Sequence, residues 1–168
     1  TDRRAVKLHW EAYEKAGCPE ITDMNSLLDA AELMLAAMPE ADDGNQMYGT
    51  VLNAGSDTSY WACMNCWYQF QGYEVTELPY LLEANMEEGT VSSILSTDSK
   101  YYEGLKWYNQ AYKRGLLDPD SISNDRATQK PKVDNGYAVL PSGYLPGWAP
   151  TYMPYLVPDT TIYYNYTN

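Results

Sequence analysis

The chain has 168 residues, 45% of them hydrophobic, which fits one folded domain and excludes a disordered or collagen-like chain. Its 11 basic and 23 acidic residues give a formal net charge of −12, which would repel a nucleic-acid backbone. No window of the sequence holds the roughly 18 apolar residues that a membrane-spanning helix needs. We therefore expect a globular domain with no nucleic-acid partner, whose acidic surface serves solubility.

Tyrosine and tryptophan are over-represented, with 17 Tyr and 5 Trp against one Phe. Both side chains join an apolar ring to a polar edge, so they suit half-wet surfaces and binding clefts as well as cores. The excess therefore indicates a recognition surface.

Two helices are predicted at the start of the chain. Asp2 is a suitable cap for a helix over 3–16, and Gly17 follows it as a stop. Thr22 or Asp23 caps a second helix, whose apolar residues recur at helical spacing. Those residues are Leu27, Leu28, Ala31, Leu35 and Met38.

Two buried strands are predicted, one over 47–53 and one over 136–140, from their β-branched, aromatic and small residues. An aromatic helix over 58–70 follows the first strand. Residues 72–89 are expected to form a loop with a short hairpin, and 90–95 a further strand. Strands that alternate with helices in this way are typical of an α/β domain.

The second half of the chain predicts two more helices. The run 96–99 is a cap signal for a helix over 100–114, and 124–134 is expected to be a helix interrupted near Pro131. A last strand is predicted over 161–166. In the helix over 100–114, residues recur at helical spacing, namely Tyr101, Leu105, Tyr108 and Tyr112. The three tyrosines of this stripe are expected to be buried.

The three cysteines do not form a recognisable site. Cys63 and Cys66 have the C-x-x-C spacing of redox and metal sites, but a zinc site needs four ligands. The other candidates, Cys18 and His9, are not placed in a second paired motif. We expect thiols that are buried or adventitiously paired, with no metal and no cofactor.

The sequence has no standard catalytic motif for phosphate binding, acyl transfer or zinc proteolysis. His9, the single histidine, lies in the first predicted helix and is expected to be structural. Asp118, Asp120 and the pair Glu87 and Glu88 could supply the acids of a glycoside hydrolase. Asp118 and Asp120 follow a helix end, however, where turn and capping chemistry explains them better, and we expect no catalysis.

Four segments, taken in order, carry a family resemblance. Residues 17–28 read Gly-Cys-Pro-Glu-Ile-Thr-Asp-Met-Asn-Ser-Leu-Leu, and residues 48–56 read Tyr-Gly-Thr-Val-Leu-Asn-Ala-Gly-Ser. Residues 105–120 read Leu-Lys-Trp-Tyr-Asn-Gln-Ala-Tyr-Lys-Arg-Gly-Leu-Leu-Asp-Pro-Asp, and residues 135–140 read Asn-Gly-Tyr-Ala-Val-Leu. Together they resemble the second lobe of the extracellular solute-binding protein family 1, the carbohydrate-type receptors of ABC importers.

The resemblance covers most of residues 5–148 and departs from the family in two places. Where the family usually has an acidic residue, this chain has Asn25 and Ser26, so we expect an imperfect capping box. Residues 149–168 match poorly, and the family's first lobe has no counterpart. We therefore expect residues 1–168 to form a single domain, a second-lobe fragment excised from a longer protein.

The resemblance implies both a fold and a function. The fold is one lobe of a periplasmic-binding-protein type II fold, an α/β lobe that is helix-rich with a small sheet. Such a lobe closes with a first lobe over a small-molecule solute, here a sugar such as an oligosaccharide, and delivers it to the membrane permease of an ABC importer. The full-length receptor would be extracellular and lipid-anchored to the cell membrane.

Candidate ligand contacts follow the two predicted buried strands, because open α/β sheets bind ligands at the carboxyl ends of their strands. Carried over by position, these contacts are Asn53, Asp57, Tyr60, Trp61, Tyr144 and Trp148. Packing in the core is the alternative for the aromatic rings, and it is the interpretation we prefer for Trp67.

Two other classes of function stay open. A carbohydrate-active enzyme domain would also use an aromatic surface, but it needs two carboxylates that face each other across a cleft. An extracellular adhesion module would have no concave aromatic pocket.

Overall fold

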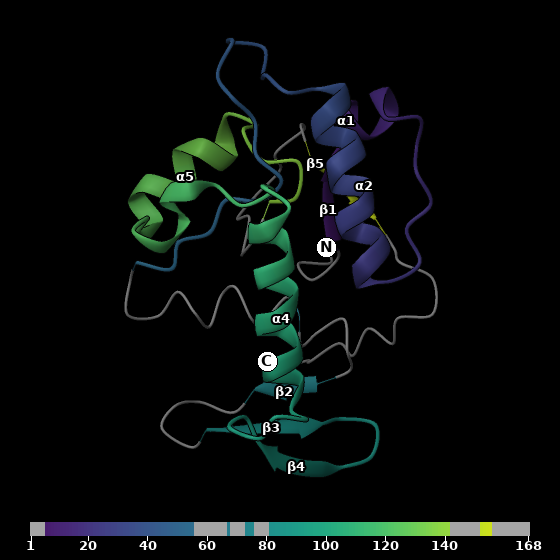
Figure 1. The fold of residues 1–168 in the computed structure, drawn as a ribbon, viewed down its shortest axis with the longest axis vertical. Coiled ribbons are helices and arrows are strands. Elements are labelled where there is room, and N and C mark those ends of the chain that lie inside the picture. Colours follow the sequence, from purple (N-terminus) through teal and green to yellow (C-terminus); the bar gives the residue numbers. More distant parts are fainter. Residues whose placement is uncertain (1–5, 56–66, 68–72, 76–80, 142–151, 156–168) are drawn as a thin grey trace, which may run out of the picture.

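The structure is a computed structural model that describes residues 6–55, 67, 73–75, 81–141 and 152–155. Helices and short strands both occur along these residues (Figure 1), a mixed architecture compatible with the α/β class expected from the sequence. None of the helices in the described part is long and apolar enough to span a bilayer.

The described chain begins with strand β1, Val6–His9, and continues directly into helix α1, Trp10–Lys15. The helix predicted over 3–16 is therefore wrong in its first part. Residues of β1 pair in antiparallel register with β5, Tyr152–Tyr155, a partner far away in the sequence that local patterning did not reveal. Tertiary pairing has overridden the local helical pattern.

Helix α2, Met24–Ala37, begins where the sequence predicts, with Asp23 as its cap. The Asp23 carboxylate accepts a hydrogen bond from the backbone N–H of Ser26 at 2.7 Å, and the Ser26 hydroxyl accepts one from the Asp23 N–H at 2.9 Å. The expectation of an imperfect capping box is thus wrong, because the hydroxyl of Ser26 replaces the acidic side chain.

The two predicted buried strands lie beside each other, although they form isolated bridges instead of full strands. A parallel bridge joins Tyr48 to Ala138, and another joins Thr50 to Leu117. The backbone N–H of His9 donates to the Val139 carbonyl at 2.9 Å, so β1 and β5 continue the series. The backbone thus links five segments in the order 116–118, 48–50, 137–140, β1 and β5.

A separate three-stranded antiparallel sheet forms the part of the chain predicted as a hairpin and a strand. It consists of β2, Tyr73–Val75, β3, Leu82–Asn85, and β4, Thr90–Ser93. In Figure 1 this sheet lies at the amino end of helix α4, Lys100–Lys113, which begins after the predicted cap residue Ser99.

Helix α4 buries a different face from the one expected. Its buried residues are Gly104, Trp107 and Ala111, whereas Leu105 is 45% and Tyr112 63% exposed. The indole N–H of Trp107 donates to the Met24 carbonyl at 2.7 Å, which turns this face toward α2. The predicted burial is therefore wrong for Tyr112, and the other two tyrosines of the stripe, Tyr101 and Tyr108, are half-buried.

After α4 the chain forms a short 3-10 helix, η1, Pro119–Ile122, capped by Asp118, and then helix α5, Arg126–Asp134. The capping role predicted for Asp118 is confirmed. The interruption predicted at Pro131 is wrong, since α5 runs through this residue. Ala127, whose carbonyl loses its donor to the proline, is exposed, so water can satisfy it.

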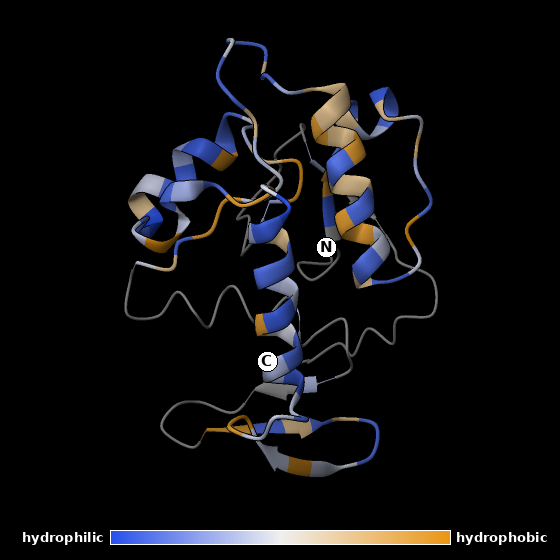
Figure 2. Ribbon diagram, viewed as in Figure 1, coloured by the Kyte–Doolittle hydropathy of each residue, from blue (hydrophilic) through white to orange (hydrophobic). Residues whose placement is uncertain are grey.

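The main hydrophobic cluster joins α1 and α2 to α4 and the bridged segments. Figure 2 shows hydrophobic residues along α2, whereas α4 and α5 are largely hydrophilic. Trp67 is buried in this cluster, 6.0 Å from Trp107 between ring centroids, which confirms the core role predicted for it. Cys18 is a free thiol and exposed, so the expectation of a buried or paired thiol is wrong for this residue.

Candidate functional site

Of the six predicted ligand contacts, Asn53 lies in the described part of the structure, and it is 8% exposed. The other five lie outside the described residues, as do Cys63, Cys66 and the strand predicted over 161–166. Their roles stay predictions. These five contacts are Asp57, Tyr60, Trp61, Tyr144 and Trp148.

Asn53 follows the carboxyl end of the segment 48–50, and this end belongs to a shared edge. Because both bridges of this segment are parallel, its neighbours 116–118 and 137–140 run in the same direction. The three segments therefore end at one edge of the series, which we call the carboxyl edge. The chain leaves this edge toward residues 56–61 after one segment and toward 142–148 after another.

A buried polar network from η1 and α5 fixes the carboxyl edge. The Leu52 N–H donates to the Ser121 hydroxyl at 3.0 Å, and the Gln129 amide donates to the Val51 carbonyl at 2.9 Å. The Asn124 amide reaches the Leu52 carbonyl at 3.4 Å. Since an unpaired buried backbone group costs about 1–3 kcal/mol, this network holds the chain just before Asn53 in one conformation.

Backbone contacts at the same edge leave no room for a side chain at Gly55. A Cβ atom there would lie 2.4 Å from the carbonyl oxygen of Ser123. The N–H of Gly55 donates to the Asn124 carbonyl at 2.9 Å, and that of Ala54 donates to the Ser121 carbonyl at 2.9 Å. Residues 54 and 55, which precede the candidate contact Asp57 in the sequence, are therefore closely packed against 121–124.

Two of the acids considered for hydrolysis, Asp118 and Asp120, are bonded within the same part of the fold. Asp118 is 1% exposed, and its carboxylate accepts from the Asn124 amide at 3.1 Å and from the Lys132 ammonium at 2.7 Å. Lys132 also bonds Asp120 at 3.2 Å. Burial alone would lower the pKa of Lys132, but these two carboxylates outweigh it and raise that pKa. Lys132 therefore bonds both carboxylates within the fold.

Sequence reasoning missed Ser121, Asn124 and Gln129. Their signal in the sequence is weak, since small polar residues after a helix usually indicate a turn. They act at a distance, because the side chain of Gln129 contacts a carbonyl 78 positions earlier in the chain. The nearest local sign was Gly55, a glycine at the expected strand end, which indicates a close backbone approach.

The chain matches no model of a known protein family and no curated protein. The resemblance to solute-binding receptors therefore stays a hypothesis. The geometry of the carboxyl edge does not depend on this resemblance.

Proposed function

We propose that this chain is the second lobe of a two-lobed receptor that binds a small solute, a sugar, without chemical conversion. The observation that supports the proposal is the carboxyl edge. Two parallel segments end there, and in the sequence each of them is followed by two of the candidate aromatic contacts.

The edge suits binding for a physical reason. Ligands of open α/β sheets bind outside the carboxyl ends of the strands, where loops from neighbouring strands converge. Binding residues act best on loops that a rigid scaffold positions. The buried side chains of Ser121, Asn124 and Gln129 give the carboxyl edge that rigidity.

The residue types that follow these two segments in the sequence match a sugar. A pyranose presents a flat apolar face and a rim of hydroxyls, so it needs rings for stacking and amide or carboxylate groups for hydrogen bonds. Tyr60, Trp61, Tyr144 and Trp148 are the proposed stacking rings. Asn53 and Asp57 are the proposed polar contacts, with Asn53 at the floor of the cleft because its side chain is mostly buried.

One lobe supplies half of such a site. In the proposed receptor a first lobe closes over the solute and excludes water, so that both lobes contribute contacts. The loaded receptor then delivers the solute to the membrane permease of an ABC importer. The receptor is extracellular and anchored to the cell membrane by a lipid.

Calorimetry with a panel of oligosaccharides tests the proposal on the full-length receptor and on this chain alone. The full-length protein is expected to bind one class of sugar, and the chain alone at least tenfold more weakly, because it lacks half the contacts. Chromatography of the same mixtures should show intact sugar. Cleavage products would favour the enzyme alternative, and tight binding by the isolated chain would contradict the two-lobe mechanism.

Single substitutions in the full-length protein test the contacts. Trp61→Ala and Trp148→Ala are each expected to weaken sugar binding about tenfold, since one lost stacking contact is worth about 1.4 kcal/mol. Tyr112→Ala is the matched control, because this tyrosine is 63% exposed on α4 and should leave the affinity unchanged. Unchanged binding by both tryptophan variants would remove the proposed site.

A further inference from the structure

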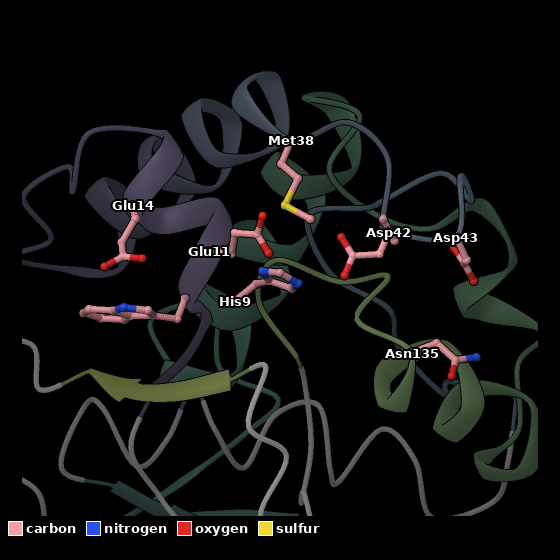
Figure 3. Close-up of a pocket in the computed structure, with 9 residues that line it drawn as sticks. His9, Glu11, Glu14, Met38, Asp42, Asp43 and Asn135 are labelled. Atoms are coloured by element: carbon pink, nitrogen blue, oxygen red, sulfur yellow. The ribbon is translucent and has the colours of Figure 1, made fainter.

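A pocket of about 370 Å³ (Figure 3) lies at the end of the bridged segments opposite to the carboxyl edge. It is bounded by the junction of β1 and α1 and by the loop that follows α2. Asp42 and Asp43 precede the segment 48–50, and Asn135 precedes 137–140, whereas Asn53 follows the carboxyl edge. The pocket is therefore distinct from the proposed sugar site, and its chemistry is independent of that site.

Four carboxylates line this pocket, from Glu11, Glu14, Asp42 and Asp43, and no lysine or arginine among the described residues lines it. Lys15 pairs with Glu11 at 2.7 Å but does not line the pocket. Hydrogen bonds from the Tyr137 hydroxyl and from Asn45 hold the pKa of Asp43 below its ordinary value. The pocket therefore has a negative potential at neutral pH.

His9 provides a second, independent feature that points to a ligand. Its side chain is 4% exposed, and its Nδ1 accepts a hydrogen bond from the Ala12 N–H at 3.3 Å. The ring of Tyr152 packs edge-on against it at a centroid distance of 5.6 Å. Burial lowers the pKa of His9, against the opposing charges of Glu11 and Asp42, so the imidazole is neutral near pH 7 and has its proton on Nε2.

The Nε2–H of His9 has no hydrogen-bond partner within the described part of the chain. Fully buried side-chain nitrogens and oxygens of that part all have partners, so this N–H reaches the open space of the pocket. Figure 3 shows the imidazole between the carboxylates of Glu11 and Asp42, facing the cavity. The neutral N–H donor of His9 thus lies beside carboxylates that can accept hydrogen bonds from a cation.

We propose that this pocket binds a small organic cation that carries a hydroxyl group two carbons from its charged nitrogen, such as an amino alcohol. The ammonium group bonds the carboxylates, and the hydroxyl accepts the Nε2–H of His9. A simple alkylamine satisfies the acids and leaves His9 unpaired, while an amino acid brings a carboxylate that the pocket repels. A bare metal ion fits poorly, since no three potential metal ligands converge within the described residues.

Three compounds with the same three-carbon skeleton separate these contributions. 2-Amino-1,3-propanediol has the ammonium and the hydroxyls, glycerol lacks the ammonium, and isopropylamine lacks the hydroxyls. In NMR titrations of the chain near pH 7, the amino diol is expected to shift the His9 and Asp42 resonances saturably. Glycerol and isopropylamine should bind at least tenfold more weakly. Equal shifts with glycerol or isopropylamine, or no saturable shift with the amino diol, would overturn the proposal.

Variants tie the binding to the named groups. Asp42→Asn is expected to weaken binding of the amino diol at least tenfold, because it removes one of the carboxylates that the ammonium contacts. Glu20→Gln removes an exposed carboxylate outside the pocket and should change nothing. His9→Gln should reduce the preference for the amino diol over isopropylamine. If the His9→Gln protein does not fold, the affinity of Asp42→Asn decides the test. Unchanged affinity in Asp42→Asn would contradict the proposal.

Discussion

His9 is buried between the end of β1 and the start of α1, and this position changes the pKa of its imidazole. Burial, the largest effect, lowers the pKa of its imidazole from 6.5, Lys15 adds to the lowering, and Glu11 and Asp42 oppose it. In the unfolded chain the imidazole returns to its ordinary pKa. Between the two pKa values the unfolded chain therefore binds more protons than the folded one, so stability is lost as the pH falls below about 6.5.

Thermal unfolding followed by circular dichroism should show this dependence. We expect the Tm of the unmodified chain to fall between about pH 7 and about pH 5, and that of His9→Asn to fall less. Asparagine caps a helix well and does not titrate, so it keeps the cap on α1 and removes the imidazole. Parallel pH profiles for the two proteins would show that another group controls stability in this range.

At the scale of elements, Glu83 links the separate sheet to α4. Its carboxylate, 2% exposed on β3, accepts from the backbone N–H groups of Lys100 at 2.9 Å and Tyr101 at 3.0 Å. These are donors of the first turn, which a helix cannot satisfy itself, and the positive end of the helix favours a negative charge. The Ser92 hydroxyl on β4 also donates to this carboxylate, at 3.3 Å.

Glu83→Gln is expected to destabilise the chain by about 1–3 kcal/mol, because it replaces a charged acceptor at the start of α4 and turns an N–H donor toward other donors. Urea denaturation measures the change. Glu87→Gln, in the exposed turn after β3, is the control and should change the free energy of unfolding by less than about 0.5 kcal/mol. Equal effects of the two variants would contradict the role given to Glu83.

The elements that the sequence predicts well are those with local signals. Asp23 and Ser99 cap α2 and α4, and the apolar spacing of α2 matches the face that it buries. In α4, both the tyrosine stripe and the face of Trp107 have helical spacing, so periodicity cannot choose between them. The hydrogen bond from Trp107 to α2 determines which face is buried, and this contact belongs to the tertiary structure. Strand β1 was missed for the same reason, since its partner is β5.

At the scale of the molecule, the sequence predicts which segments end at the candidate site but not what holds them there. The composition of 47–53 and 136–140 predicts two buried strands, and Asn53 lies at the end of the first. The network of Ser121, Asn124 and Gln129 depends on contacts between residues far apart in sequence, which no local pattern encodes. The pocket at His9 likewise assembles from three separate parts of the chain.

The proposed receptor makes a prediction about shape that a single-lobed protein does not. If two lobes close over a sugar, the radius of gyration of the full-length protein should decrease when the sugar binds, whereas that of this chain alone should not change. Small-angle X-ray scattering with and without sugar measures both. Trp148→Ala should leave the sugar-free radius unchanged and require about tenfold more sugar for closure, since weaker contacts shift the open–closed equilibrium less. A sugar that binds the full-length protein without any decrease in radius would mean that the carboxyl edge is not one wall of a closing cleft.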